Sequence, residues 1–162
     1  MTAPLLFILA ALALTLSPQK AAADAALIIL DRGQLPFELG PGHPANSPTR
    51  PGNAPHASWN SGANTANGGS VWQNRPSNPA NENRLIFTAH GDVLGYYAPN
   101  AGGVLNLFDV NGRRVAYRPA RGTKSLFSTS GQWCGTVDSP RGGGMVLAMT
   151  PECARLFSGH GG

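Results

Sequence analysis

The residues that could carry chemistry in this chain are few and lie far apart. Three carboxylates, Asp92, Asp109 and Asp138, each fall near the end of a predicted β-hairpin, so they could form a cluster suited to acid–base catalysis. The simpler interpretation, which we favour, is that they keep the hairpin ends solvated. The four histidines are scattered, and no pair has metal-ligand spacing on one element. The sequence therefore predicts no catalytic residue, no metal and no cofactor.

A short basic stretch offers a different chemistry, the binding of anions. It consists of Arg113, Arg114, Arg118, Arg121 and Lys124. These side chains could hold an anionic surface, a polysaccharide or a phosphate, with Arg113, Arg114 and Arg118 as candidate ligand-binding residues. More often, such residues keep an exposed sheet edge soluble. The formal net charge of +4 is far below that of a nucleic-acid binder, so we predict no nucleic-acid partner.

Two tryptophans, Trp59 and Trp72, are the other candidate ligand-binding residues. Exposed indole rings can act as stacking platforms for sugar rings or for a partner protein. Alternatively, both rings fold back and cover an edge of the C-terminal sheet. We favour the second interpretation, because isolated tryptophans on a mobile chain would bind weakly.

The chain contains 2 cysteines, Cys134 and Cys153. In an exported protein, such a pair predicts a disulfide, which would stabilise the fold by roughly 3 kcal/mol by closing a loop of about twenty residues. A reactive thiol at Cys134 would need a histidine base, and no histidine lies near it in the sequence. The cysteines are therefore predicted to be structural.

Ahead of these residues lies an asparagine repeat with a period of seven. Its positions are Asn46, Asn53, Asn60, Asn67, Asn74 and Asn81, and a second register of proline and glycine runs beside them. A coiled coil is excluded, because its repeating positions are apolar and proline breaks helices. Two structures remain, a solvated chain of bends and a stacked coil with the asparagines in a ladder. We favour the solvated chain, because the repeat has few apolar residues to fill an interior.

The C-terminal part contains a second repeat, which predicts β-hairpins. The aligned stretches are LIFTAHGDVLGYY from Leu85, NLFDVNGRRVAYR from Asn106 and SLFSTSGQWCGTV from Ser125. The pair Asn111-Gly112 predicts a two-residue type I′ turn. That turn would place Phe108 opposite Val115 and Asp109 opposite Arg114.

The equivalent apolar pairs in the other two hairpins are Phe87 with Leu94 and Phe127 with Cys134. Gly95, Ala116 and Gly135 would let neighbouring hairpins pack closely. We therefore predict a mostly β fold, a small antiparallel meander of six to eight strands. It ends in a short helix that Thr150 caps and Pro151 begins.

The N-terminus has the pattern of a secretory signal. An apolar run from Leu5 to Leu16 is too short to span a bilayer, and Ala21-Ala22-Ala23 suits signal cleavage between Ala23 and Ala25. The predicted parts are a signal peptide at 1–23, a short segment at 24–38 that can form a strand, an Asn/Pro/Gly heptad-repeat spacer at 39–83, a β-hairpin domain with a C-terminal helix at 84–157 and a flexible tail at 158–162. No membrane span is expected after cleavage.

Heptads of this kind, followed by NRLIF, a hairpin turn and LGYY, resemble a group of bacterial exported proteins of uncharacterised function. The resemblance covers about Asn46–Tyr97 and implies no activity or site residues. We predict an exported, non-enzymatic binding or structural module of the cell envelope, periplasmic or extracellular. An envelope polysaccharide or protein is the candidate partner, and specific recognition is expected in the hairpins. The alternative is a small secreted enzyme or enzyme inhibitor that uses hairpin-end carboxylates or arginines.

Overall fold

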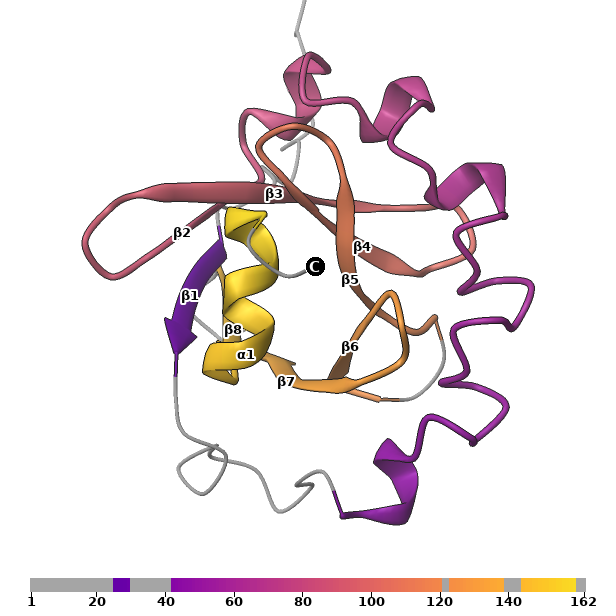
Figure 1. Ribbon diagram of the computed structural model, residues 1–162. Helices are drawn as coiled ribbons and strands as arrows, with labels where there is room; N and C mark the ends of the chain where they lie inside the picture. Colours follow the sequence, from indigo (N-terminus) through magenta and orange to yellow (C-terminus); the bar gives the residue numbers. More distant parts are fainter. Residues whose placement is uncertain (1–24, 30–41, 121–122, 139–143, 160–162) are drawn as a thin grey trace, which may run out of the picture.

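Eight strands close into a small barrel (Figure 1). The computed structural model describes residues 25–29, 42–120, 123–138 and 144–159, so the predicted signal peptide lies outside the described residues. The strands are β1 (Ala25–Ile29), β2 (Leu85–Phe87), β3 (Val93–Pro99), β4 (Leu105–Asp109), β5 (Arg114–Arg118), β6 (Ser125–Ser128), β7 (Trp133–Asp138) and β8 (Met145–Met149).

Strands β2 to β8 form an antiparallel meander, and β1 closes the ring by pairing in parallel with both β2 and β8. The prediction of a mostly β meander with a short C-terminal helix is confirmed. Strand β1 lies in the segment for which the sequence allowed a strand.

The hairpin turns differ from the predicted two-residue type I′ loop. Gly112 has a φ of 81°, whereas no described residue other than glycine has a positive φ, so Asn111 is not left-handed. The Gly112 N–H donates to Asp109 O, and the Asp109 N–H donates to Arg113 O. The loop is therefore a type I turn followed by a left-handed glycine. Gly91 and Gly131 close the neighbouring hairpins in the same way.

The longer turn shifts the register of each hairpin by one residue. Phe108 lies opposite Arg114, and Leu107 lies opposite Ala116, so the predicted pairing of Phe108 with Val115 is wrong. The same shift replaces the predicted pairs of Phe87 with Leu94 and of Phe127 with Cys134. In each hairpin the second strand carries one extra residue at a β-bulge. These extra residues are Leu94, Val115 and Cys134, and all three pack in or against the core of the barrel.

The predicted opposition of Asp109 and Arg114 is also wrong. The Asp109 carboxylate instead accepts the backbone N–H groups of Asn111 and Arg113 and the Arg113 side chain, at 2.9–3.0 Å. The predicted close packing of neighbouring hairpins is confirmed at Gly95 and Gly135. A Cβ at Gly95 would collide with the Phe108 carbonyl, and one at Gly135 with the Ala148 carbonyl.

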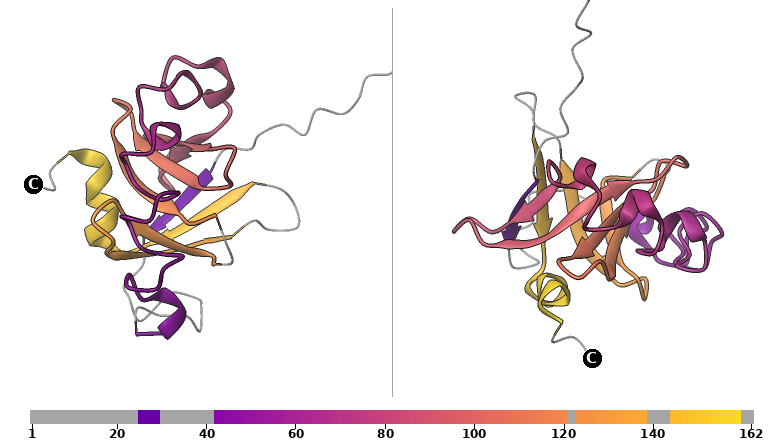
Figure 2. Two further views of the ribbon diagram at one scale, coloured as in Figure 1. Left: turned by 90° about the vertical axis from the view of Figure 1, so that its right-hand side faces the viewer. Right: turned by 90° about the horizontal axis from the view of Figure 1, so that it is seen from above.

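A short helix closes the end of the barrel at which the hairpin turns lie (Figures 1 and 2). Helix α1 (Pro151–Ala154) continues into a 3-10 turn, η6 (Arg155–Ser158). Thr150 is the N-cap as predicted, because its side chain accepts the Cys153 N–H. Phe157 and Ala154 enter the barrel core. The predicted Cys134–Cys153 disulfide is present and joins the bulge of the β6–β7 hairpin to this helix.

The asparagine repeat runs as an ordered coil along one side of the barrel (Figure 2). Its short 3-10 turns are η2 (Pro44–Asn46), η3 (Thr65–Asn67), η4 (Trp72–Asn74) and η5 (Pro79–Asn81). All five residues of β4 are buried, because the core lies on one face of this strand and the coil on the other. The solvated and flexible spacer that we favoured from the sequence is therefore wrong.

Candidate functional site

The coil is held together by the side chains of its repeat asparagines, whose exposed fractions are at most 2%. From Asn53 to Asn81, each Nδ2 donates to the carbonyl groups eight and six residues earlier. Asn60, for example, donates to Gly52 O at 2.9 Å and to Ala54 O at 3.1 Å. Each asparagine side chain thus joins its own turn of the coil to the preceding turn. The coil has a polar interior, and it does not need apolar filling.

The backbone supports the same arrangement. The N–H of each repeat asparagine donates to the carbonyl three residues earlier, at 2.8–2.9 Å. The repeat also accommodates its prolines, because they occupy positions at which the coil uses no backbone N–H as a hydrogen-bond donor. Every turn of the coil is therefore fixed both by its own backbone and by the next asparagine.

Three turns of the coil match one hairpin of the barrel. Tyr117 donates its hydroxyl to Asn53 O and Tyr96 donates to Asn74 O, both at 2.6 Å. The two tyrosines are 21 residues apart, and so are the two asparagines. Side-chain contacts repeat in the same way, because Ser125 and Asn106, from equivalent hairpin positions, donate to the Oδ1 atoms of Asn46 and Asn67 respectively. The coil is therefore docked in register with the hairpin repeat.

Burial under the coil perturbs the docking tyrosines. Desolvation raises the pKa of Tyr96 and of Tyr117 to about 12, and the Asp109 charge adds to the effect at Tyr96. Because both folded-state pKa values exceed the unfolded value of about 10, the folded state keeps protons that the unfolded chain releases. Their stabilising effect is complete below pH 10 and is lost as the pH rises towards 12. Burial lowers the pKa of Arg114 to about 10, which opposes this loss in part.

We therefore expect the free energy of unfolding to fall by roughly 2–4 kcal/mol between pH 9.5 and pH 12. The combined variant Tyr96→Phe and Tyr117→Phe should be less stable at pH 8, and its stability should no longer fall between pH 9.5 and pH 12, because Arg114, whose effect has the opposite sign, remains. Urea unfolding at a series of pH values measures both quantities. An unchanged pH slope in the double variant would mean that other groups cause the alkaline loss.

The predicted candidate residues Trp59 and Trp72 lie on the outer side of the coil. Their exposed fractions are 45% and 52%, so the interpretation in which they cover a sheet edge is wrong. Trp59 Nε1 makes a long hydrogen bond of 3.5 Å to Gly52 O, which orients the ring on the coil surface. Trp72 begins the 3-10 turn η4. Both indoles therefore stand on a backbone that the buried asparagines hold in place.

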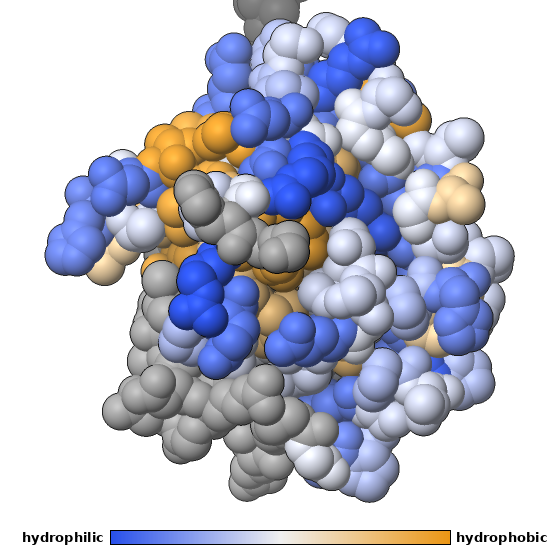
Figure 3. All heavy atoms as spheres, in the orientation of Figure 1, coloured by the Kyte–Doolittle hydropathy of each residue, from blue (hydrophilic) through white to orange (hydrophobic). Residues whose placement is uncertain are grey.

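The surroundings of these rings are polar and carry little charge, although the exposed Arg75 lies back against them and donates from Nε to Ser70 O at 2.9 Å. From Pro51 to Asn74 the sequence has no Asp, Glu, Lys or Arg, and its side chains are mainly amides, hydroxyls and small groups. The coil side of the molecule is mostly blue to white on a hydropathy scale, with a few pale-orange atoms, whereas the strongly orange atoms gather over β3 and beside α1 (Figure 3). The coil thus presents two aromatic rings on a neutral face rich in hydrogen-bonding groups. We call residues 51–74 the tryptophan face.

The structure separates the candidate arginines. Arg113 pairs with Asp109 at 2.9 Å and donates to Leu156 O at 2.7 Å, so it ties a hairpin turn to η6. Arg114 lies beneath the coil, where it donates to Asn106 Oδ1 and Asn60 O and covers the Tyr117 ring at 4.9 Å. These two residues hold the fold together. Arg118 lies at the other end of β5, beside a separate cavity.

The three candidate carboxylates do not converge. Asp109 is buried in its hairpin turn, and Asp92 lies at the neighbouring turn near Thr88 Oγ1. Asp138 ends β7, at the end of that strand opposite its hairpin turn, and pairs with Lys124 at 2.7 Å. Within the described ranges, no group of three or more His, Cys, Asp or Glu residues could hold a metal ion. In the same part of the chain, no helix has both the length and the apolar character needed to cross a membrane.

The sequence contained a signal for the docked coil that our interpretation did not use. The spacing from Tyr96 to Tyr117 equals three heptads, as does that from Asn53 to Asn74. A polar repeat and a hairpin repeat that share this spacing can make equivalent contacts at the first two hairpins. Asn106, which binds Asn67 from below, was not among the predicted site residues.

Comparisons with protein-family models, with curated proteins and with solved structures find no match to this chain. The argument for function therefore depends on the chemistry of the described residues.

Proposed function

We propose that this protein is an exported, non-enzymatic module of the cell envelope that binds a neutral polysaccharide on the tryptophan face. The observation that carries the proposal is the exposure of Trp59 and Trp72 on an ordered coil whose residues 51–74 include no Asp, Glu, Lys or Arg. Aromatic rings contribute large apolar contact areas at little entropic cost when they are already fixed. This differs from the sequence-based expectation, which placed recognition in the hairpins.

The chemistry of a neutral glycan fits this face. The C–H faces of sugar rings stack on indole rings, and sugar hydroxyls exchange hydrogen bonds with amide and hydroxyl side chains. Amides supply both donors and acceptors, as sugars do. A charged polymer would find no counter-charge within residues 51–74 and would meet only the flanking Arg50 and Arg75, so an uncharged polysaccharide is favoured over an anionic one.

Export to the periplasm or the cell exterior is part of the proposal. It is supported by the apolar run from Leu5 to Leu16, the small residues Ala21 to Ala23 and the disulfide. Disulfides persist mainly in oxidising compartments. The resemblance of Asn46–Tyr97 to exported bacterial proteins agrees with this location. The separation of Asp92 and Asp109 from Asp138 supports a binding role over a catalytic one.

The proposal predicts that each tryptophan contributes separately to glycan affinity. Trp59→Ala and Trp72→Ala should each weaken binding to hydroxyethyl cellulose or galactomannan by about five- to tenfold, which corresponds to roughly 1 kcal/mol. The double variant should bind about 50-fold more weakly or not at all. Affinity electrophoresis in gels that contain these polymers measures the change.

Val110→Ala is the matched control, because Val110 is 52% exposed like Trp72 but lies outside the tryptophan face, on a hairpin turn beside Pro76 and Asn81. It should bind as the wild type does. Equal affinity of the wild type and the double tryptophan variant would contradict the proposal. Binding by the wild type to polygalacturonate alone would also contradict it.

A further inference from the structure

A second feature of the molecule, a cavity at the end of the barrel opposite the helix, is not explained by glycan binding. It has a volume of about 360 Å³ and is lined by Leu105, Arg118, Lys124, Val137, Asp138 and Met145. Leu105 and Val137 belong to the apolar core of the barrel, and Met145 packs against it. The cavity is therefore the open mouth of the barrel interior, while α1 and η6 close the other end.

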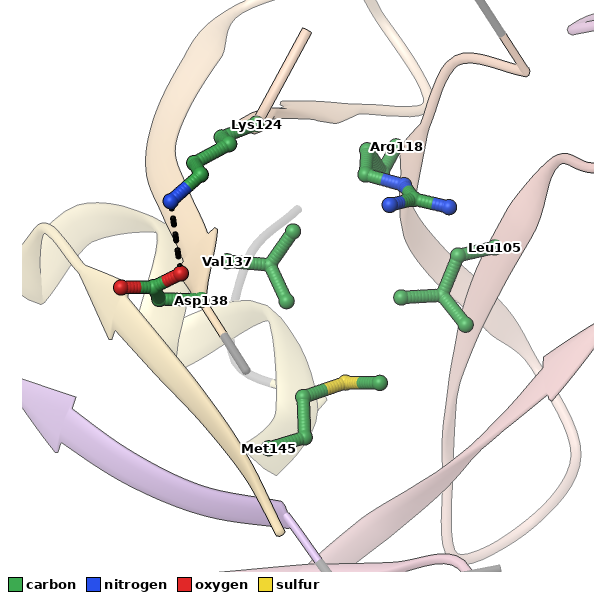
Figure 4. A pocket seen from close by; sticks show the side chains of 6 residues that line it. All are labelled: Leu105, Arg118, Lys124, Val137, Asp138 and Met145. Atoms are coloured by element: carbon green, nitrogen blue, oxygen red, sulfur yellow. Dashed lines mark hydrogen bonds and ion pairs between the residues drawn. The ribbon is translucent and has the colours of Figure 1, made fainter. Parts of the chain in front are cut away.

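The side chains divide the cavity into an apolar and a charged part. In Figure 4, the Arg118 guanidinium lies beside Leu105, and Val137 and Met145 face them across the space. The ion pair between Lys124 and Asp138 lies beyond Val137 on the same side of the cavity as Met145. A ligand that enters would meet the apolar side chains and the guanidinium together.

Among the residues that line the cavity, Arg118 is the one with a buried donor that the described residues leave unused. Its Nε is buried and has no hydrogen-bond partner. Buried donors in proteins are nearly always satisfied, and a guanidinium presents five N–H groups in a planar fork. Arg113 and Arg114, from the same basic stretch, each donate to two protein acceptors, although Arg114 Nη2 is also buried without a partner. A ligand acceptor at Arg118 would satisfy this donor.

The charge of the cavity selects the kind of acceptor. Arg118 and Lys124 carry two positive charges and Asp138 carries one negative charge, so the lining residues sum to +1. A single negative charge neutralises this sum, whereas a phosphate dianion would leave an excess. A carboxylate also matches the two parallel N–H groups of a guanidinium.

We propose that the barrel mouth binds a small monocarboxylate with an apolar body, such as an aryl- or alkyl-acetate. The carboxylate accepts from Arg118, and the apolar body packs against Leu105, Val137 and Met145. The volume lies in the lower part of the range for small-molecule sites. This site is separate from the tryptophan face, and it does not depend on glycan binding.

Isothermal titration of the full chain with phenylacetate tests the proposal, with the neutral isostere phenylacetamide and with benzyl phosphate as comparison ligands. We expect phenylacetate to bind, and the two comparison ligands to bind at least about tenfold more weakly. Arg118→Gln should lower phenylacetate affinity at least about tenfold. Arg155→Gln, which removes an exposed arginine of η6, should leave it unchanged.

Met145→Trp gives an independent test, because it fills the cavity while Arg118 stays in place. It should also weaken phenylacetate binding about tenfold or more, and thermal unfolding of each variant shows whether the fold is retained. The proposal is overturned if the wild type does not bind phenylacetate, or if phenylacetamide or benzyl phosphate binds equally well. It is also overturned if folded Arg118→Gln or Met145→Trp keeps wild-type affinity.

Discussion

Replacing Asn67 with alanine is expected to lower the free energy of unfolding by about 4 kcal/mol, more than any other single substitution in the coil. The Asn67 side chain donates to the carbonyls of Trp59 and Ser61 and accepts from the side chains of Asn100 and Asn106. Its removal leaves four polar groups at the junction of coil and barrel without this partner. Each buried group that stays unsatisfied costs about 1–3 kcal/mol.

Two further variants give this prediction its control. Gln73→Ala removes an amide from an exposed position of the same coil and should change stability by no more than about 0.5 kcal/mol. Asn67→Asp keeps the size of the side chain but places an oxygen where two carbonyls need a donor, so it should be at least as destabilising as alanine. Urea unfolding measures all three. Near wild-type stability of Asn67→Asp would show that the hydrogen bonds from the repeat asparagines to the preceding turn do not hold the coil.

The second large effect is expected from the disulfide. The combined variant Cys134→Ala and Cys153→Ala should lose about 3 kcal/mol, because the bond closes a loop with a sequence separation of 19. The bond also joins the bulge of the β6–β7 hairpin to helix α1. Helix α1 continues into η6, whose residue Phe157 packs into the core at that end of the barrel. Freeing the helix should therefore expose apolar core in addition to relaxing the chain. Thermal unfolding and binding of a hydrophobic dye measure these two consequences.

A reducing agent provides the control for the disulfide. It should destabilise the wild type by about the same amount and leave the double variant unaffected. If the reduced wild type unfolds at the temperature of the oxidised protein, the bond contributes nothing to stability, and the helix is held by packing alone.

The hairpin domain shows how far local sequence patterns determine this fold. The repeated apolar and glycine positions predicted the meander, the close approach at Gly95 and Gly135, the helix cap at Thr150 and the disulfide. They did not determine the register. Asn111-Gly112 fits both a two-residue turn and a type I turn followed by glycine, and either choice buries the apolar residues. The two turns are distinguished by the backbone hydrogen bond from the Asp109 N–H to Arg113 O and by the absence of a positive φ at Asn111.

The coil was misjudged because its stabilising contacts are polar and non-local. A count of apolar residues predicts whether a segment can form an apolar interior. This coil is instead held by asparagine amides that donate to the carbonyls of the preceding turn. The position of the tryptophans follows from the same geometry. Trp59 directly precedes Asn60, whose side chain points inward, so the neighbouring ring is left outside. Trp59 and Trp72 were recognised as candidates from their type, but their exposure could be inferred only after the inner face was known.

The arginines illustrate the opposite limit, in which residues close in sequence serve different parts of the structure. Arg113, Arg114 and Arg118 looked like one basic patch. Strand β5 separates Arg114, under the coil, from Arg118, at the barrel mouth. A strand of five residues is long enough to place its first and last residues at opposite ends of a small barrel. Sequence proximity therefore did not indicate a shared site.

Hydrogen–deuterium exchange of residues 51–81 in the intact protein tests most directly the claim that the repeat is an ordered coil that holds the tryptophan face. The account predicts that the backbone amides of Asn53, Asn60, Asn67 and Asn74 exchange as slowly as those of strands β4 and β7, because they are buried and hydrogen-bonded. Exchange of these amides at the rate of an unstructured peptide, while the strands stay protected, would contradict the account.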